Sequence, residues 1–172
     1  MSRLRRIEHT ARYFFVTTNL AAGVPPLTGR ERDICLGCLE DARKKHGFLL
    51  FGYAVMPDHA HLVLGVFKSS LPVLMRDWKR QSGFAVGKAR HFRGPIWQQR
   101  YFDFILRRVG DLGKKLEYVH QNPVAAGLVA RPEDWLWSSA GFHIAHSTAP
   151  VQLDVLDVPA DRNAPLWPVR WK

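Results

Sequence analysis

Two histidines, His59 and His61, carry the clearest chemical signal in the sequence, because they stand two residues apart at the start of an apolar run. The run HAHLVLGV predicts a β-strand, in which alternate side chains point to the same face. Both imidazoles therefore share one face, while Ala60, Leu62 and Leu64 face the opposite side and belong to a core. Imidazole nitrogens are good metal ligands, so the pair predicts a metal site. The alternative is a pair of half-exposed strand histidines that bind nothing.

A second group of polar residues occurs in the segment KLEYVHQNPVAAGLV, where Tyr118 and Asn122 are four residues apart. This spacing places both side chains on one face of a helix. Pro123 predicts that the helix ends near Asn122, because a residue before proline prefers extended backbone. Taken alone, Tyr118 is explained by packing on a sheet and Asn122 by capping the end of the helix. Their occurrence together with the histidine pair is what favours a chemical role.

The two cysteines of the chain, Cys35 and Cys38, form a C-x-x-C motif. They lie on an apolar stripe with helical spacing, in the segment ICLGCLEDARKK. No second pair of cysteines is available to complete a zinc site. The motif therefore predicts packing in a helix core, in preference to zinc binding or redox chemistry.

The hydrophobic pattern predicts the elements that position these residues. Strands are expected at 12–19, 48–56, 59–67 and 97–108, and helices at 30–46, 70–91 and 111–121. The first six elements follow the split βαβ, or ferredoxin-like, plan, so the predicted class is α+β, a four-stranded antiparallel sheet with two helices on one face. The seventh is an extra helix that carries Tyr118. We expect one domain over 1–149 and a C-terminal tail over 150–172.

Positive charge is concentrated in one part of the chain. The net charge is +10, and between Lys68 and Lys115 twelve lysines and arginines stand against three acids, which accounts for +9 of it. A local excess of this kind indicates a surface that binds a polyanion, whereas a basic surface kept for solubility would be spread evenly. Phosphate contacts are expected from seven residues of this segment: Arg76, Lys79, Arg80, Lys88, Arg90, Arg93 and Arg100.

Composition excludes several classes of protein. Hydrophobic residues make up 47% of the chain and charged residues 23%, which suits a globular domain and argues against bulk disorder. No apolar run is long enough to span a membrane, and the N-terminus has no apolar core or cleavage site of a signal peptide. A cytoplasmic protein is expected. For Trp97 and Tyr101, which follow the basic helix, buried packing is favoured over stacking on nucleic-acid bases.

Four segments in a fixed order carry a family resemblance: MPDHAHLVL, GPIWQQRYFDFIL, EYVHQNPVAAGLV and WLWSSAGFH. Together they resemble the REP-associated tyrosine transposases, which belong to the HUH single-tyrosine superfamily, over residues 12–142. The resemblance implies a ferredoxin-like core and a Mg²⁺ or Mn²⁺ ion held by His59, His61 and Asn122. It also implies that Tyr118 is the nucleophile and that the partner is single-stranded or hairpin DNA.

The implied reaction is cleavage and rejoining of a DNA strand. Attack by Tyr118 on a phosphate would give a 5′-phosphotyrosine and a free 3′-hydroxyl, and the bond energy is kept so that the reverse step can rejoin strands. A free tyrosine is only about one thousandth phenolate at neutral pH, a cost of roughly 4 kcal/mol that a metal and nearby positive charge must offset in part. The metal would also polarise the scissile phosphate. Histidine and amide ligands suit Mn²⁺ by softness, and abundance in cells favours Mg²⁺.

The chain departs from the family pattern at two places. Ala60 stands between the histidines, where relatives often have a bulkier residue, and the change affects core packing. Before the first strand the chain reads His9-Thr10-Ala11, where the family often carries two glycines that are thought to contact the foot of the DNA hairpin.

Two other classes of function use residues that occur in this sequence. A metal-dependent hydrolase of the His-x-His-x-Asp-His type is disfavoured, because Val63 and Leu64 stand where the acid and third histidine would be. The second is a ferredoxin-like nucleic-acid-binding protein without catalysis, a domesticated transposase, and the intact pair of histidines with Tyr118 argues against it. A monomer is expected in preference to a dimer, since the chain is longer than minimal family members.

Overall fold

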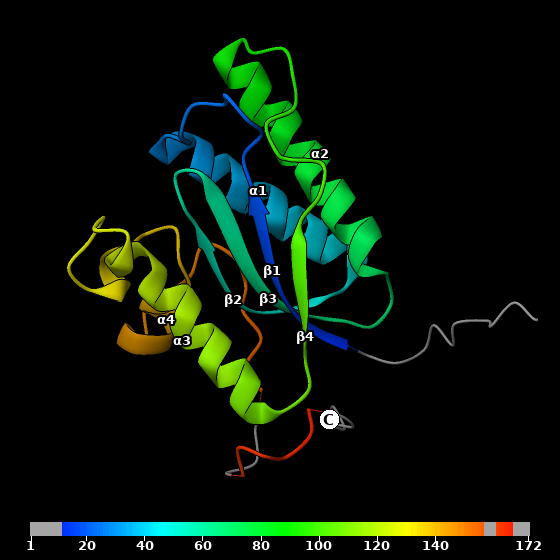
Figure 1. Ribbon diagram of the computed structural model, residues 1–172, viewed down its shortest axis with the longest axis vertical. Helices are drawn as coiled ribbons and strands as arrows, with labels where there is room; N and C mark the ends of the chain where they lie inside the picture. Colours follow the sequence, from blue (N-terminus) through cyan, green and yellow to red (C-terminus); the bar gives the residue numbers. More distant parts are fainter. Residues whose placement is uncertain (1–11, 157–160, 167–172) are drawn as a thin grey trace, which may run out of the picture.

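Four antiparallel strands form one sheet in the order β2-β3-β1-β4 (Figure 1). The computed structural model describes residues 12–156 and 161–166, so His9-Thr10-Ala11 lies outside the described residues. The strands are β1 (Arg12–Asn19), β2 (Leu49–Val55), β3 (His59–Val66) and β4 (Phe102–Leu106). The helices are α1 (Gly29–His46), α2 (Leu71–Arg90), α3 (Val109–Ala125) and the short α4 (Ala140–Ala145), with one 3₁₀ turn at Pro132–Asp134.

The sheet separates two hydrophobic cores. On one face, Phe14 and Val16 of β1 pack with buried residues of α1 and α2. On the other face, Tyr13 and Phe15 pack with residues of α3 and of the C-terminal segment. Successive residues of β1 thus contribute to opposite cores, because alternate side chains of a strand point to opposite faces of the sheet. The predicted ferredoxin-like α+β class is confirmed, with α1 and α2 on one face of the sheet and the extra helix α3 on the other (Figure 1).

The helix α1 begins and ends as its sequence predicts. Thr28 accepts from the Glu31 N–H, and the Glu31 carboxylate accepts from the Thr28 N–H, which forms a capping box. Gly47 ends the helix with a positive φ of 61°. Cys35 lies fully buried in the core under α2, as the apolar stripe predicts, and burial raises the pKa of its thiol to about 12.

The fourth strand is shorter than predicted. Of the expected 97–108, only Phe102–Leu106 pairs along β1, and Trp97 makes an isolated bridge to Leu20. The preceding residues are drawn to α2, because the Lys79 ammonium donates to the carbonyl groups of Gln98 and Gln99 at 2.5 and 3.0 Å. Trp97 is buried, as predicted, with its ring 5.4 Å from that of Trp78.

The third helix is longer than predicted and continues through Pro123 to Ala125. A proline in the last turn removes a single N–H donor, and the next turn still closes, because the Ala126 N–H donates to the Asn122 carbonyl at 3.0 Å. Ala126 is the C-cap residue, so Asn122 is an internal helical residue and the capping interpretation of it was wrong.

A buried hydrogen-bond cluster holds α3 against β2. The Ser139 hydroxyl accepts from the Tyr53 N–H at 3.0 Å, donates to the Tyr53 carbonyl at 3.3 Å, and accepts from the His120 ring at 2.9 Å. The register of β2 shifts between Leu50 and Gly52, and a Cβ at Gly52 would collide with the Leu116 side chain. Glycine therefore permits the close approach of helix and strand, and the cluster sets how α3 is rotated on the sheet.

The C-terminal residues that the structure describes pack on this body. Val151 is buried in the core beside α1, and Leu156 and Leu166 are buried in the core beneath α3. The two carboxylate oxygens of Asp154 accept hydrogen bonds from the Arg43 guanidinium at 3.0 and 2.8 Å. The carboxylate also accepts a hydrogen bond from the Leu50 N–H at 2.9 Å. No helix within the described part of the chain is both long and apolar enough to cross a lipid bilayer.

We expect the substitution His120→Gln to reduce the acid sensitivity of the fold. Burial, with a smaller contribution from nearby His143, lowers the pKa of His120 from 6.5 to about 4. Between these values the unfolded chain binds more protons than the native one. The contribution of His120 to the free energy of unfolding is therefore fully present above pH 6.5 and decreases as the pH is lowered toward 4. The shift corresponds to about 3 kcal/mol.

Urea unfolding across this pH range measures the effect. Glutamine keeps an amide that can reach Ser139 but has no titratable proton, so the variant should show a shallower slope than the wild type. His146→Gln, at an exposed histidine, is the matched control and should keep the wild-type slope. Equal slopes in all three proteins would contradict the assignment of this acid sensitivity to His120.

Candidate active site

The two histidines of β3 and the asparagine of α3 meet on the α3 face of the sheet. The Nε2 atoms of His59 and His61 are 3.1 Å apart, and His59 Nε2 lies 3.2 Å from Asn122 Oδ1. Alternation along β3 puts both imidazoles on this face, and the helical rotation of α3 turns Asn122 toward them. The structure thus brings together the three residues that the sequence analysis named as metal ligands.

Each imidazole is oriented by a partner on its other nitrogen. His59 Nδ1 donates to Asp58 Oδ1 at 2.6 Å, and His61 Nδ1 lies 2.8 Å from the Thr17 hydroxyl. Thr17 is the residue directly opposite His61 in the β1–β3 pairing, so the strand register creates this contact. With both Nδ1 atoms engaged, both Nε2 atoms are left to face Asn122.

Sequence reasoning missed both partners. Asp58 does carry a sequence signal, since a carboxylate directly before a candidate ligand histidine is a common outer partner of its ring. No local signal identifies Thr17, because its contact depends on the strand register.

Burial keeps His61 neutral. Its exposed fraction is 3%, and desolvation, followed by the nearby charges of His59 and Lys115, lowers its pKa from 6.5 to about 3. A neutral ring whose Nδ1 faces a hydroxyl can present the Nε2 lone pair to a ligand. The electrostatics of the site therefore suit metal coordination or acceptance of a hydrogen bond by this nitrogen.

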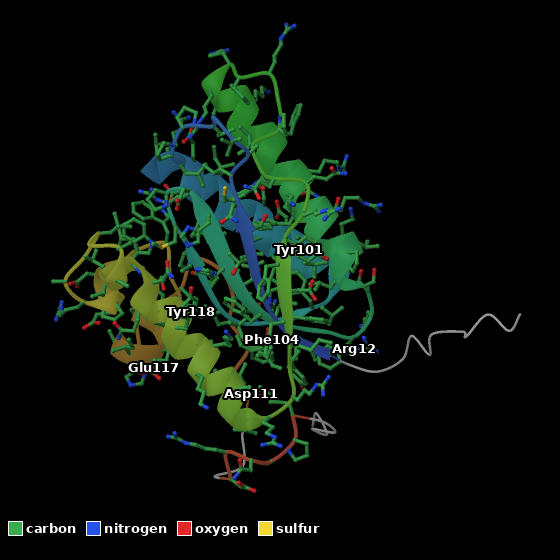
Figure 2. All side chains as sticks on the ribbon, viewed as in Figure 1. Arg12, Tyr101, Phe104, Asp111, Glu117 and Tyr118 are labelled. Atoms are coloured by element: carbon green, nitrogen blue, oxygen red, sulfur yellow. The ribbon has the colours of Figure 1, made fainter. Side chains whose placement is uncertain are left out.

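Tyr118 stands beside the histidines, one helical turn before Asn122. Its ring centroid lies 5.4 Å from that of His61 and 5.7 Å from that of Phe15, with both rings met nearly edge-on. The residue remains 49% exposed, so packing on the sheet does not seal it from solvent. Figure 2 labels Tyr118 on α3 and Phe104 on β4. A solvent-accessible phenol beside the ring of His61 is an arrangement that can act as a nucleophile.

A basic groove runs between α2 and the segment 92–101. Its volume is about 1010 Å³, and Phe84, which is 75% exposed, contributes to its wall. Five of the seven predicted phosphate-binding residues line this groove: Arg76, Lys79, Arg80, Lys88 and Arg93. Arg100 is exposed just beyond it, before β4. Tyr101 also lines the groove, half-buried, with the Lys79 ammonium 5.6 Å above its ring.

Arg90 does not line the groove and instead forms an ion pair inside the protein. Its guanidinium donates to both oxygens of Glu31, at 2.5 and 2.6 Å, and to the carbonyl groups of Pro25 and Pro26, each at 2.8 Å. The side chain is 14% exposed, and the pairing with Arg90 lowers the pKa of Glu31 to about 2. The interpretation of Arg90 as a DNA contact is therefore corrected to a structural ion pair that ties α2 to the start of α1.

The segment that lines the groove continues into the strand next to the site. Tyr101 ends the groove segment, and Phe102 begins β4 opposite Thr17, which itself lies opposite His61. Phe102 and His61 are therefore two interstrand spacings apart, about 10 Å.

Fold and site together define an α+β protein of ferredoxin-like plan whose extra helix places a tyrosine and an asparagine over a strand histidine pair. The chain is similar over nearly its whole length to a REP-associated tyrosine transposase of Escherichia coli (strain K12), with 25% identity over 164 residues that cover 93% of this chain and 96% of that protein. A relative from Haemophilus influenzae that bears the same family name is 29% identical over 100 residues, 52% of this chain and 56% of its own length.

A solved structure agrees in fold. A REP-associated tyrosine transposase bound to a REP hairpin superposes with a TM-score of 0.70 and 23% identity, covering 93% of this chain and 96% of that one. No family model matches the sequence. The resemblance to the REP-associated tyrosine transposases that the four sequence segments carry is confirmed by the two relatives and by this fold.

Proposed function

We propose that this protein is a transposase that cleaves and rejoins single-stranded DNA at a hairpin, with Tyr118 as the nucleophile. The observation that carries the proposal is that His61 and Asn122 both lie within hydrogen-bonding distance of His59, beside the Tyr118 ring. Near full-length similarity to a REP-associated tyrosine transposase supports it. The related structure holds a REP hairpin, which supports hairpin DNA as the partner here.

The three polar residues fit a divalent metal ion. Two ligands about 2.1 Å from one ion and at right angles to each other are about 3 Å apart, close to the 3.1 and 3.2 Å separations of the donor atoms here. Asp58 and Thr17 hold the imidazoles by their outer nitrogens, as the second partners of ligand histidines do. Two imidazoles and an amide oxygen suit Mn²⁺, and Mg²⁺ is the abundant alternative.

The donor set leaves room for substrate. Among the described residues, no group of three or more histidine, cysteine or carboxylate side chains could hold a metal, so His59, His61 and Asn122 are not extended to a closed four-residue site. This separates the site from a metallohydrolase with an additional acid and histidine. When bound, the ion would polarise the scissile phosphate and stabilise the charge that grows on it.

The protein's own residues carry out the exchange of bonds. The Tyr118 oxygen forms a bond to phosphorus while the bond from phosphorus to the 3′ oxygen breaks, which yields a 5′-phosphotyrosine and a 3′-hydroxyl. Since Tyr118 is half-exposed, its proton can pass to solvent. One phosphodiester replaces another, so the 3′-hydroxyl can reverse the step and restore the strand. The Lys115 ammonium, 5.5 Å from the Tyr118 ring, adds positive charge where phosphate must bind.

We expect Tyr118→Phe to abolish covalent attachment to DNA while leaving noncovalent affinity within about twofold of the wild type. The substitution removes the attacking oxygen and keeps the ring that packs on Phe15 and His61. A denaturing gel of end-labelled hairpin DNA, with Mn²⁺ or with chelator, detects the adduct. Tyr101→Phe is the matched control and should keep the adduct. Cleavage that survives in Tyr118→Phe would remove the proposed role of this residue.

We expect Asp58→Ala to weaken Mn²⁺ binding by about 10- to 100-fold, the usual effect of losing the outer partner of a ligand histidine. His59 would keep its nitrogen donor but lose the carboxylate that holds the ring at 2.6 Å. Calorimetric titration with Mn²⁺ measures the change. Asp41→Ala, at an exposed acid of α1, should bind like the wild type. Unchanged affinity in both Asp58→Ala and His59→Ala would contradict the proposed ligand set.

Arg76→Ala and Arg90→Ala form a pair that separates binding from folding. Loss of Arg76 from the groove should weaken single-stranded DNA binding and reduce the dependence of log affinity on log salt by about one unit. Loss of Arg90 leaves Glu31 buried without its partner and should lower the free energy of unfolding by about 3 kcal/mol while the folded protein binds DNA normally. Fluorescence anisotropy over a salt series and urea unfolding report the two effects. The reverse pattern would contradict both assignments.

A further inference from the structure

Two phenylalanines of β4 form an exposed aromatic shelf next to the candidate site. Phe102 is 58% exposed and Phe104 is 46% exposed. Both occupy the face of the edge strand that also carries Leu106, which is buried in the core beneath α3. Large apolar side chains grouped on a surface usually mark a contact with another molecule. We call Phe102 and Phe104 the shelf.

The shelf is in direct register with the site residues. Phe102 pairs with Thr17, the partner of His61, and Phe104 pairs with Phe15 in the neighbouring row. The Phe15 ring lies 6.4 Å from the Phe102 ring, 5.5 Å from the His61 ring and 5.7 Å from the Tyr118 ring. Phe15 therefore forms a buried floor that joins the exposed shelf to the proposed nucleophile.

A lysine lies over this floor. The Lys115 ammonium is 4.5 Å from the Phe15 ring centroid and 5.5 Å from those of both Phe104 and Tyr118. In the part of the chain that the structure describes, no carboxylate lies within ion-pairing distance of Lys115. The shelf thus combines exposed ring faces with a cation that has no carboxylate counter-charge among these residues.

Exposed rings together with a positive charge favour single-stranded nucleic acid as the molecule that binds to the shelf. An apolar protein partner would cover the rings but leave the Lys115 charge unpaired, whereas unpaired nucleotides offer flat bases for the rings and phosphates for the ammonium. The basic groove supplies the path, since the segment that lines it ends at Tyr101 and continues in the chain as Phe102. A single strand that leaves the groove and passes around the edge strand β4 meets the shelf on the α3 face of the sheet, beside Tyr118.

We propose that Phe102 and Phe104 stack the unpaired bases next to the cleaved phosphodiester while Lys115 contacts a neighbouring phosphate. The proposal rests on the proposed function, because it places these bases beside Tyr118. Stacking on a phenyl ring accepts every base, so the shelf contributes affinity and alignment, and base identity must be read elsewhere.

Substitutions that separate stacking from apolar contact test the shelf. The probe is a DNA hairpin flanked by single-stranded oligothymidine, with binding followed by fluorescence anisotropy. We expect Phe102→Ala and Phe104→Ala each to weaken binding by about tenfold. Phe104→Tyr should bind like the wild type because it keeps an aromatic ring, and Phe104→Leu should bind like Phe104→Ala. Leu136→Ala, at a residue that is 72% exposed in the turn before α4, is the control for loss of surface apolar area.

A second measurement maps the contact. The same probe with 5-iododeoxyuridine in the single-stranded flanks should, on irradiation, cross-link to the peptide that contains Phe102 and Phe104. Lys115→Ala should reduce the salt dependence of binding, and Lys115→Arg should restore it. Wild-type affinity in Phe102→Ala and Phe104→Ala, equal affinity of Phe104→Leu and Phe104→Tyr, or cross-links confined to the α2 groove would overturn the proposal.

The two proposals fail in different ways. Loss of the shelf would leave the Tyr118 adduct detectable at saturating DNA, since the nucleophile and the candidate metal ligands are untouched. An absent adduct in the wild type, together with intact shelf cross-links, would overturn the proposed cleavage and leave the stacking contact standing.

Discussion

The close approach of α3 to the sheet is the packing constraint on which the candidate site depends. Gly52 leaves no side chain between β2 and the helix, and the buried hydrogen bond from His120 to Ser139 fixes the helix in one rotation. Apolar contact alone holds a helix on a sheet but is non-directional, whereas a hydrogen bond to a group anchored on the strand backbone has a direction. This rotation turns Tyr118 and Asn122 toward β3. The positions of these two candidate site residues on one side of α3 therefore depend on the hydrogen bond that His120 makes on another side.

The second constraint is the orientation of the two imidazoles. A histidine on a strand can present either nitrogen, and the choice follows from what the other nitrogen meets. Asp58 and Thr17 engage the Nδ1 atoms of His59 and His61, so both Nε2 atoms point to the same small space. Burial keeps the inner ring of His61 uncharged, which removes the repulsion that two imidazolium ions at this distance would suffer.

The two faces of the sheet differ in how completely they are covered. The face under α1 and α2 is closed by a continuous apolar core and by the buried pair of Arg90 with Glu31, which serves the fold although both residues are charged. The other face is only partly covered, because α3 lies across β2 and β3 and leaves the edge strand β4 open (Figure 1). Exposed aromatic side chains beside a basic groove are unfavourable in water, and the proposed contact with unpaired bases and phosphates would cover them.

The sequence by itself determined the order of elements, the ferredoxin-like plan and the pairing of His59 with His61 on one face, because these follow from local periodicity that each segment carries alone. It also placed the positive charge near α2. Only the tertiary structure decided that Thr17 holds His61 and that Arg90 serves the fold, since both depend on partners 44 and 59 residues away that strand register and helix docking bring near. The helix end beyond Pro123 was decided in the same way: local preference favours an end before proline, and packing on the sheet outweighs the loss of one hydrogen bond.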